Sequence, residues 1–187
     1  MVANIPYAIS TELLSALLPR GAAFGVLVLL VQEELAQRLV VAPAGASDAR
    51  EMSLRVRFYA APRYCRFVPR AAFTPPPRVD SAVVAFALAH PTAWPLPPGA
   101  RTAAFFGFMR AAFASRRKML RNTLAARPGA TPERIAAAIA AAGAQPDVRP
   151  QELALPQFLS LFCALEPDGA AGGGAQGGSG GDGVGAR

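Results

Sequence analysis

Apolar runs alternate with amphipathic stretches along residues 1–92, and this pattern predicts strands and helices in turn. Residues 24–31 form a continuous apolar run rich in Val and Leu, which predicts a strand covered on both faces. Elsewhere apolar residues recur at helical spacing, bounded by start and stop residues such as Ser10 and Pro19. The predicted helices are 9–18, 32–41 and 52–61, and the predicted strands are 24–31, 64–68 and 81–88.

The chain after residue 92 has a different pattern. Residues 93–100 are rich in proline and predict a linker. Residues 101–166 show only helical periodicity, with Phe105 and Phe108 on one face, and predict a small helical domain. Residues 167–187 are glycine-rich and predict a disordered tail whose glycines follow no strand, so they do not form a phosphate-binding loop.

Composition narrows the partners that such a protein could have. At 187 residues and 52% hydrophobic, the chain can bury one sizeable core with at most a small second domain, which excludes a disordered protein. The formal net charge of +7 and the pI near 10.7 favour a polyanionic partner. That partner is either a nucleic acid or an anionic membrane surface.

The sequence gives no support for a metal site, a disulfide framework or a membrane-spanning helix. Cys65, Cys163 and the single His90 are far apart, which excludes zinc-ligand spacing and a disulfide framework and favours a reducing compartment. The longest apolar run, 22–31, has about half of the roughly 20 residues of a membrane helix. The start resembles neither a secretory signal nor a transit peptide. We expect that the protein stays where it is made or that an upstream segment is missing from this chain.

The first candidate for chemistry is the tetrapeptide Asn4-Ile5-Pro6-Tyr7, which has the pattern that base-amine methyltransferases use to hold their target base. The Asn4 side-chain oxygen and the Ile5 carbonyl would accept the two amine hydrogens and favour a nucleophilic geometry. Pro6 would fix the turn that aims them, and Tyr7 would stack on the base. The alternative is an ordinary turn after a strand, with Asn4 capping and Tyr7 half-buried.

The second candidate is the proline-rich loop that precedes the last predicted strand. It presents Phe73 near Arg78, and its stiffness would let Phe73 act as the second plate of a base clamp opposite Tyr7, while Arg78 contacts RNA. The alternative is that Phe73 plugs the core beneath a proline turn.

The third candidate is a basic run directly after a predicted apolar helix. The run clusters Arg116, Arg117, Lys118 and Arg121 within two helical turns, enough to bind several RNA phosphates. The alternative is a solvated face without a ligand.

Together these motifs resemble the ribosomal RNA adenine dimethyltransferase family, the kasugamycin-resistance type, from Val2 to about Leu165. The matching segments are Asn4-Ile5-Pro6-Tyr7-Ala8-Ile9-Ser10-Thr11, residues 73–84, and Arg116-Arg117-Lys118-Met119-Leu120-Arg121-Asn122-Thr123-Leu124. Residues 64–70 and 115–121 are similar to plant chloroplast members, which implies a chloroplast location, with a cytoplasmic or mitochondrial one as the alternative.

The resemblance implies S-adenosylmethionine-dependent N6,N6-dimethylation of two adjacent adenines in small-subunit ribosomal RNA, without a metal or membrane partner. It makes Asn4 a contact of both cofactor and target amine, and Tyr7 and Phe73 the stacking pair. The implied fold is α/β: the C-terminal half of a Rossmann-like class I methyltransferase sheet over 1–92, a linker over 93–100, a small all-α RNA-binding domain over 101–166, and the tail over 167–187.

Two departures from the family pattern matter. Residues 50–56 replace the usual Tyr-Gly-x-Leu-Ser-Val, and the family's glycine-rich cofactor loop and ribose-binding acid precede Asn4-Ile5-Pro6-Tyr7, where this chain starts. We therefore expect a C-terminal portion that lacks most of the cofactor pocket and is inactive by itself. The alternatives are a non-catalytic RNA-binding or ribosome-assembly module, and a large-subunit methyltransferase of the macrolide-resistance type.

Overall fold

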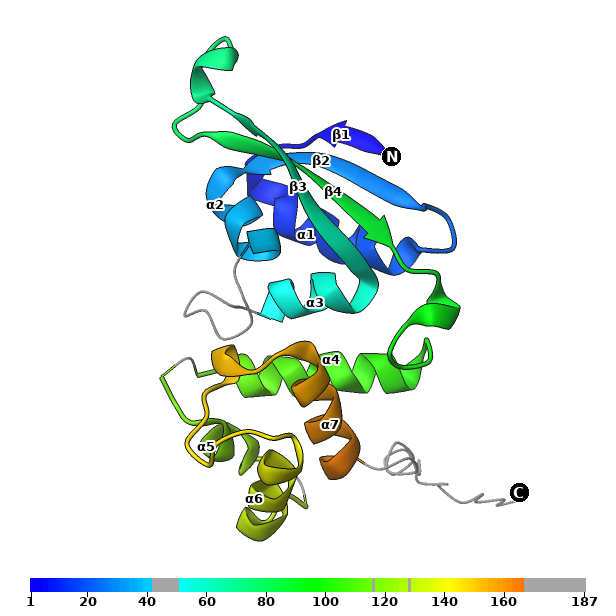
Figure 1. Cartoon of the computed structure of the whole chain (residues 1–187), viewed down its shortest axis with the longest axis vertical. Coiled ribbons are helices and arrows are strands. Elements are labelled where there is room, and N and C mark those ends of the chain that lie inside the picture. The colour runs from blue at the N-terminus through cyan, green and yellow to red at the C-terminus, as the bar shows by residue number, and fades with distance from the viewer. Residues whose placement is uncertain (42–50, 116, 128, 167–187) are drawn as a thin grey trace, which may run out of the picture.

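The computed structural model describes residues 1–41, 51–115, 117–127 and 129–166. A four-stranded sheet with helices against it forms one part of the molecule, and a group of helices forms the other (Figure 1). The sheet comprises β1 (Val2–Asn4), β2 (Val26–Gln32), β3 (Ala60–Val68) and β4 (Ser81–Leu88). The predicted α/β class is confirmed for this part of the chain.

The strand order is β1-β2-β4-β3, and the sheet is mixed. β1 pairs with β2 in parallel, whereas β4 pairs antiparallel with both β2 and β3. The sequence predicts two short strands joined by a proline-rich loop, which indicates an antiparallel pair at the end of a mixed sheet. That pair is confirmed, although β3 begins four residues earlier than predicted, at Ala60 rather than Tyr64. The parallel β1 ends at Asn4, so it delivers the tetrapeptide to the carboxyl edge of the sheet.

Helices cover one face of the sheet in the described part of the chain: α1 (Ser10–Leu17), α2 (Glu33–Ala36) and α3 (Glu51–Tyr59) (Figure 1). Along β2, Leu27, Leu29 and Val31 are fully buried beneath them, whereas Val28 and Leu30 on the other face are only half-buried. The expectation that this strand is covered on both faces is thus wrong for the described residues. A continuous apolar run does not distinguish a strand buried on both faces from one buried on one face.

The predicted helices of the first part are confirmed. The helix predicted over 32–41 is α2 followed by a π-helical turn, Gln37–Val41, and the helix predicted over 52–61 ends two residues early because Ala60 already pairs with Leu88. Between these two helices the sequence also predicts a loop over 43–48, which lies outside the described residues. Short 3-10 helices occupy Tyr7–Ile9, Leu18–Arg20, Arg70–Ala72, Pro91–Ala93 and Pro150–Glu152.

The second part is helical as predicted. It contains α4 (Ala100–Phe113), α5 (Leu120–Leu124), α6 (Pro132–Ala141) and α7 (Leu155–Leu165). The Thr131 hydroxyl accepts the backbone N–H of Arg134 and caps α6, whose first residue is a proline that needs no N–H partner.

Aromatic packing joins the two parts. Phe58 of α3 stacks on Phe105 of α4 and meets Phe106 edge-on, with centroids 5.6 and 5.0 Å apart. The segment predicted as a linker is packed too, because the Trp94 indole donates to the Ala89 carbonyl at 3.1 Å. The division into two domains stays a prediction, and the tail 167–187 lies outside the described residues.

Candidate functional site

An open groove of about 370 Å³ lies where the end of β1 meets the proline-rich loop. Two segments about 70 residues apart in sequence form it. Its lining residues are Asn4, Ile5, Pro6, Tyr7, Phe73, Pro75 and Pro77. The structure therefore brings the first two predicted motifs together in one concave site, although the catalytic role of each residue stays a prediction.

Asn4 and its neighbours are held in a fixed turn at one side of the groove. Ile5 is buried in the core, and the Pro6 carbonyl accepts the backbone N–H of Ile9 at 3.2 Å and the Ser10 hydroxyl at 3.4 Å. The Asn4 side chain is exposed and has no hydrogen-bond partner within the described part of the chain, so it does not cap the following helix. Its amide is available to a ligand.

Tyr7 is anchored by a residue that the sequence analysis did not single out. Its hydroxyl lies 2.6 Å from the Ser81 hydroxyl, which is fully buried at the start of β4. The Tyr7 ring itself is half-buried and lines the groove. Ser81 lies in the matching segment 73–84, after Val79 and Asp80, but the sequence of this segment does not reveal the partner of its hydroxyl.

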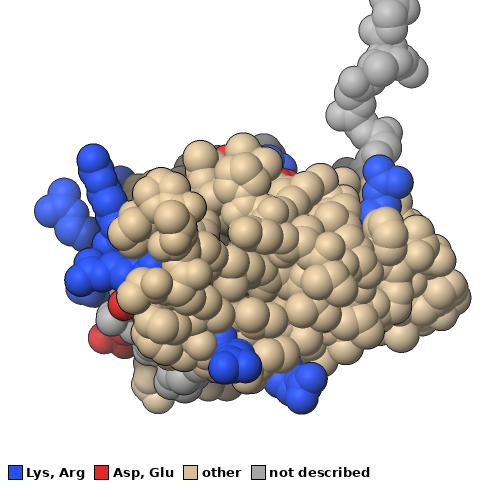
Figure 2. All heavy atoms as spheres, turned by 90° about the horizontal axis from the view of Figure 1, so that it is seen from above, with Lys and Arg blue, Asp and Glu red and all other residues tan. Residues whose placement is uncertain are grey.

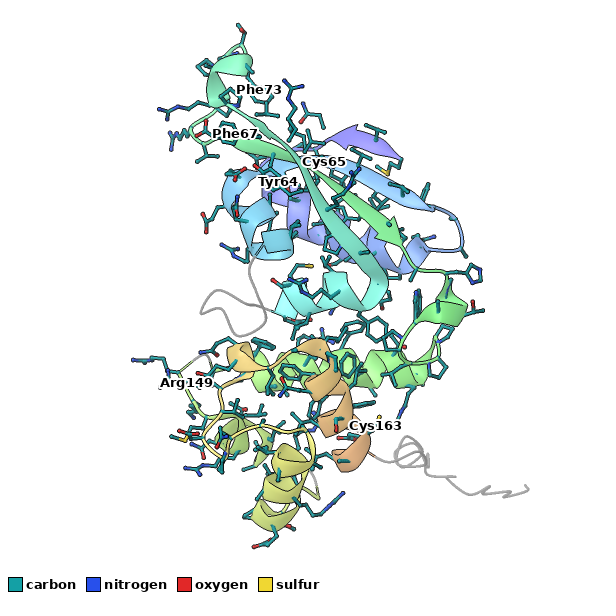
Figure 3. The ribbon with its side chains drawn as sticks, in the orientation of Figure 1. Tyr64, Cys65, Phe67, Phe73, Arg149 and Cys163 are labelled. Carbon is teal, nitrogen blue, oxygen red and sulfur yellow. The ribbon has the colours of Figure 1, made fainter. Side chains whose placement is uncertain are left out.

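Phe73 lines the groove from the loop between β3 and β4 (Figure 3). It is half-buried and does not belong to the hydrophobic core or to the residues packed against it, which argues against a core plug. The Asp80 carboxylate accepts the Arg70 backbone N–H at 2.8 Å, and Arg70 also donates to the Arg78 carbonyl at 3.4 Å. These bonds tie the two ends of the loop together.

A polar network connects the base of the loop between β3 and β4 to α2. Tyr64 donates its hydroxyl to the Glu33 carboxylate at 2.7 Å, and Gln37 donates to the same carboxylate at 2.6 Å. Burial, this hydrogen bond and the Glu33 charge raise the pKa of Tyr64 to about 12. The Glu33 backbone N–H donates in turn to the Asp80 carbonyl at 3.0 Å. The network thus links α2 and β3 to the residue next to Ser81.

The predicted RNA-binding residues do not all lie at the groove. Arg78 is exposed on the loop itself, whereas Arg117 and Lys118 are exposed in the connection between α4 and α5, not on a helix as the two-turn spacing implied. Arg121 lies in α5, at a second cleft of about 240 Å³ against α6, and Arg116 lies outside the described residues. In the view from above, Lys and Arg side chains gather at one edge of the molecule (Figure 2).

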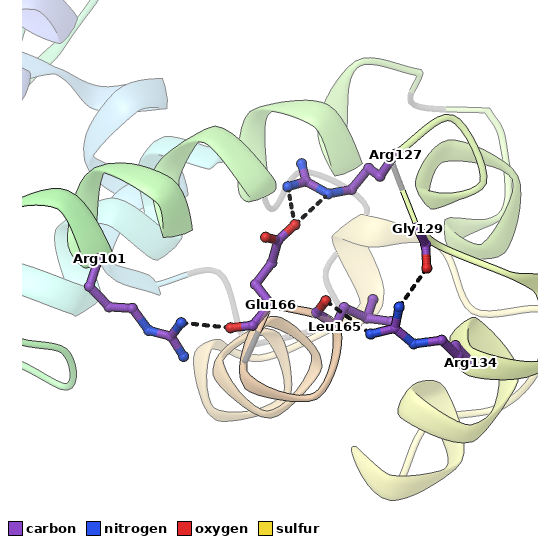
Figure 4. Close-up of polar contacts among 6 residues, drawn as sticks. All are labelled: Arg101, Arg127, Gly129, Arg134, Leu165 and Glu166. Carbon is purple, nitrogen blue, oxygen red and sulfur yellow. Dashed lines mark hydrogen bonds and ion pairs between the residues drawn. The ribbon is translucent and has the colours of Figure 1, made fainter. Parts of the chain in front are cut away.

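Three other arginines hold the end of α7 through contacts within the chain (Figure 4). Arg127 pairs with the Glu166 carboxylate, Arg101 donates to the Glu166 carbonyl at 2.6 Å, and Arg134 donates to the carbonyls of Gly129 at 2.5 Å and Leu165 at 3.4 Å. Positive charge at a helix C-terminus complements the helix dipole and the free carbonyls.

Two kinds of site are not seen in the part of the chain that the structure describes. No group of three or more His, Cys, Asp and Glu side chains is placed to hold a metal ion there. None of the helices described combines the length and apolar character required to cross a bilayer.

Comparison with known proteins gives consistent matches over most of the chain. The model of the family "Ribosomal RNA adenine dimethylase" matches residues 1–164. A chloroplastic ribosomal RNA small subunit methyltransferase of Arabidopsis thaliana is 40% identical over 161 residues, which are 86% of this chain and 46% of that protein. Ribosomal RNA small subunit methyltransferase A of Protochlamydia amoebophila is 38% identical over 165 residues, 88% of this chain and 55% of the relative. The chain thus spans about half the length of these relatives.

Two solved structures share the fold. A dimethyladenosine transferase from Plasmodium falciparum superposes with a TM-score of 0.67 at 23% identity, covering 86% of this chain and 65% of that one. The 23S rRNA methyltransferase ErmE gives 0.66 at 21% identity, covering 88% and 64%. At these identities the likeness shows the fold alone, and it agrees with the mixed sheet and helices described above.

Proposed function

Because the chain belongs to the ribosomal RNA adenine dimethylase family, we propose that it serves the S-adenosylmethionine-dependent dimethylation of N6 in adjacent adenines of small-subunit ribosomal RNA. The observation that carries the proposal is the groove in which Asn4 and Tyr7 face the loop of Phe73. An adenine turned out of its stack would enter this groove and stack on the aromatic rings.

The residues of the groove supply positioning and hydrogen bonding. The free Asn4 side-chain oxygen and the Ile5 carbonyl accept the N6 hydrogens, which favours the pyramidal amine that attacks a methyl group. Tyr7 stacks against the base, and its ring keeps its orientation because its hydroxyl is hydrogen-bonded to Ser81. Arg78 contributes positive charge for the RNA backbone beside the groove.

The cofactor S-adenosylmethionine would supply the methyl group from its sulfonium sulfur, which leaves as a neutral thioether. Among the residues present, Asn4 fits a cofactor contact, since its exposed side chain stands at the carboxyl end of a parallel strand. The printed sequence contains no glycine-rich loop that follows a predicted strand. We therefore propose that the described sheet is the target-base half of a Rossmann-like methyltransferase sheet and that this chain alone does not transfer methyl groups.

Two functions are alternatives to this proposal. The first is a non-catalytic RNA-binding module, which calorimetry with S-adenosylmethionine tests: clear micromolar binding by this chain would contradict that reading. The second is large-subunit methylation, since ErmE shares the fold as well as the parasite enzyme does. The sequence relatives at 38–40% identity are small-subunit methyltransferases and favour the small subunit. The chloroplastic relative supports a plastid location.

The proposal is tested by primer extension across the methylation sites of both ribosomal subunits in a strain that lacks the gene. We expect methylation to be lost at the adjacent adenines of the small subunit and kept at the large one. Re-expression of the gene's full reading frame, with every part that completes the cofactor pocket, should fail to restore the modification when it carries Tyr7→Ala. The same full-length protein with Arg20→Ala, a charge change on the exposed turn after α1, should restore it. Loss confined to the large subunit would overturn the choice of target.

A further inference from the structure

Phe67 is an exposed aromatic residue on a projecting arm, which comprises the end of β3, the loop 69–80 and the start of β4. Its side chain is 48% exposed, although its cross-strand partner Ala82 is fully buried. Figure 3 shows Phe67 and Phe73 on the same projecting arm. A single exposed apolar side chain is common on protein surfaces, so the groups around the ring decide whether it meets a ligand.

A β-bulge determines which way Phe67 faces. The register shifts between Tyr64 and Arg66, so that Tyr64 pairs with Val84 but Arg66 pairs with Val83. Because of this extra residue, Phe67 lies on the same face as Tyr64 rather than on the opposite one. Tyr64 reaches α2 through Glu33, whereas Phe67 lies beyond that contact and stays exposed.

The surroundings of Phe67 are basic and close to the groove. Arg66, Arg70 and Arg78 are all exposed on the same arm. Phe67 pairs with Ala82, the neighbour of the Ser81 that anchors Tyr7, so the Phe67 and Ser81 side chains leave the sheet on opposite faces. Consecutive Cα atoms are about 3.8 Å apart and paired Cα atoms about 5 Å apart, so the Phe67 and Ser81 backbones are within about 10 Å of each other.

From these observations we propose that Phe67 is a stacking platform for an unpaired RNA nucleotide that flanks the adenine held in the groove and lies across the β3 edge of the sheet from it, with the arm's arginines on the phosphates between them. Aromatic rings stack on every base without sequence preference, and interleaved arginines neutralise the backbone. The inference rests on the proposed function, because it assumes that the groove takes a base from RNA. It assigns a binding role to a residue outside the groove.

The test measures RNA affinity of the whole chain by fluorescence anisotropy, with an RNA hairpin whose loop has two adjacent adenines and with a fully paired duplex of equal length. Stacking of one base is worth roughly 1–3 kcal/mol, so Phe67→Ala should weaken binding of the hairpin about 5- to 140-fold. Binding of the duplex should change less than about twofold, since its bases are not free to stack.

Two variants control for folding and for loss of apolar surface. Phe67→Trp should keep hairpin affinity within about twofold of the wild type, because the indole still stacks. Val79→Ala removes the other exposed apolar residue of the arm, 42% exposed, and should leave hairpin affinity unchanged. Rescue by Trp together with the silent Val79 variant would assign the effect to the ring.

Several results would overturn the platform. These are an unchanged hairpin affinity in Phe67→Ala, an equal loss for the duplex, an equal loss in Val79→Ala, or a change of oligomeric state in place of RNA affinity. Because the readout is binding, such a result leaves the proposed methylation and its primer-extension test intact. Failure of that test with a clear Phe67 effect would instead leave an RNA-binding module.

Discussion

At the scale of single residues, the family resemblance predicted which side chains meet but not what holds them. Asn4, Tyr7 and Phe73 line one groove, as their family resemblance implied. Ser81 and the Tyr64–Glu33 pair could not be predicted, because a hydroxyl or a carboxylate carries no mark of its partner until the sheet register is known. The register sets these contacts, and a pattern of apolar residues fixes it only approximately.

The Tyr7–Ser81 hydrogen bond should show as a coupling in a double-mutant cycle. Tyr7→Phe leaves the fully buried Ser81 hydroxyl without this partner and should lower the free energy of unfolding by about 1–3 kcal/mol. Ser81→Ala should cost less, because the half-buried Tyr7 hydroxyl can turn to water. Urea denaturation of both variants and the double variant measures the coupling. Strictly additive effects would contradict the bond.

Tyr64 should ionise later than an ordinary tyrosine. Its pKa of about 12, against 10.0 normally, means that the folded state favours the protonated phenol. The stability that this provides is complete below about pH 10 and is lost as the pH rises through about 12. Ultraviolet titration of the wild type and of Tyr64→Phe checks this. The difference between the two curves should rise near pH 12, and a rise near pH 10 would contradict the network.

At the scale of elements, the period of the pattern predicted helices and strands well and their environment less well. The strand 81–88 and the antiparallel pair follow from alternation and a proline-rich turn. The cover of β2 does not, because burial on each face depends on which elements pack there. The basic run was expected within helical turns, yet Arg117 and Lys118 lie before α5 begins. The basic residues follow one another closely along the chain, and this pattern does not indicate where α4 ends and α5 begins.

Gly21 should be intolerant of a side chain, since it packs the turn after α1 against the end of β4. A Cβ there would lie 1.9 Å from the Ala89 carbonyl oxygen, which also accepts the Trp94 indole. Gly21→Ala should therefore lower the free energy of unfolding by about 3 kcal/mol or more. Gly25→Ala is the matched control, with no atom within 4 Å of its Cβ, and should change stability by less than about 1 kcal/mol. Thermal melts compare the two, and equal shifts would refute this packing.

The arginine contacts at the end of α7 should contribute measurably to stability. Arg127 pairs with Glu166 in a partly buried position and also lies over the Phe108 ring at 5.1 Å. Arg127→Ala should lower the free energy of unfolding by about 1–2 kcal/mol, as measured by urea denaturation. Arg110→Ala, at an exposed position of α4, should cost less than about 0.5 kcal/mol. If both variants unfold alike, the pair is not a structural clamp.

At the scale of the whole molecule, a mixed sheet presents the groove at its carboxyl edge while a helical part continues the same core. Phe58 joins Phe105 and Phe106 across the two parts, so the groove and the helices form one packed body (Figure 1). Composition predicted one sizeable core, whereas the polyanionic partner that it favours stays a prediction. Only the structure shows how the groove lies relative to the basic connection between α4 and α5, since no local sequence pattern encodes the distance between two segments.

The central claim, that the groove takes an unpaired adenine, is tested most directly by photo-crosslinking. An RNA hairpin with 8-azidoadenosine at the adjacent loop adenines is bound to the chain and irradiated, and the linked peptides are identified by mass spectrometry. The account predicts crosslinks on Tyr7 and on the segment that contains Phe73. Crosslinks confined to the cleft between α5 and α6, with none in the groove, would contradict it.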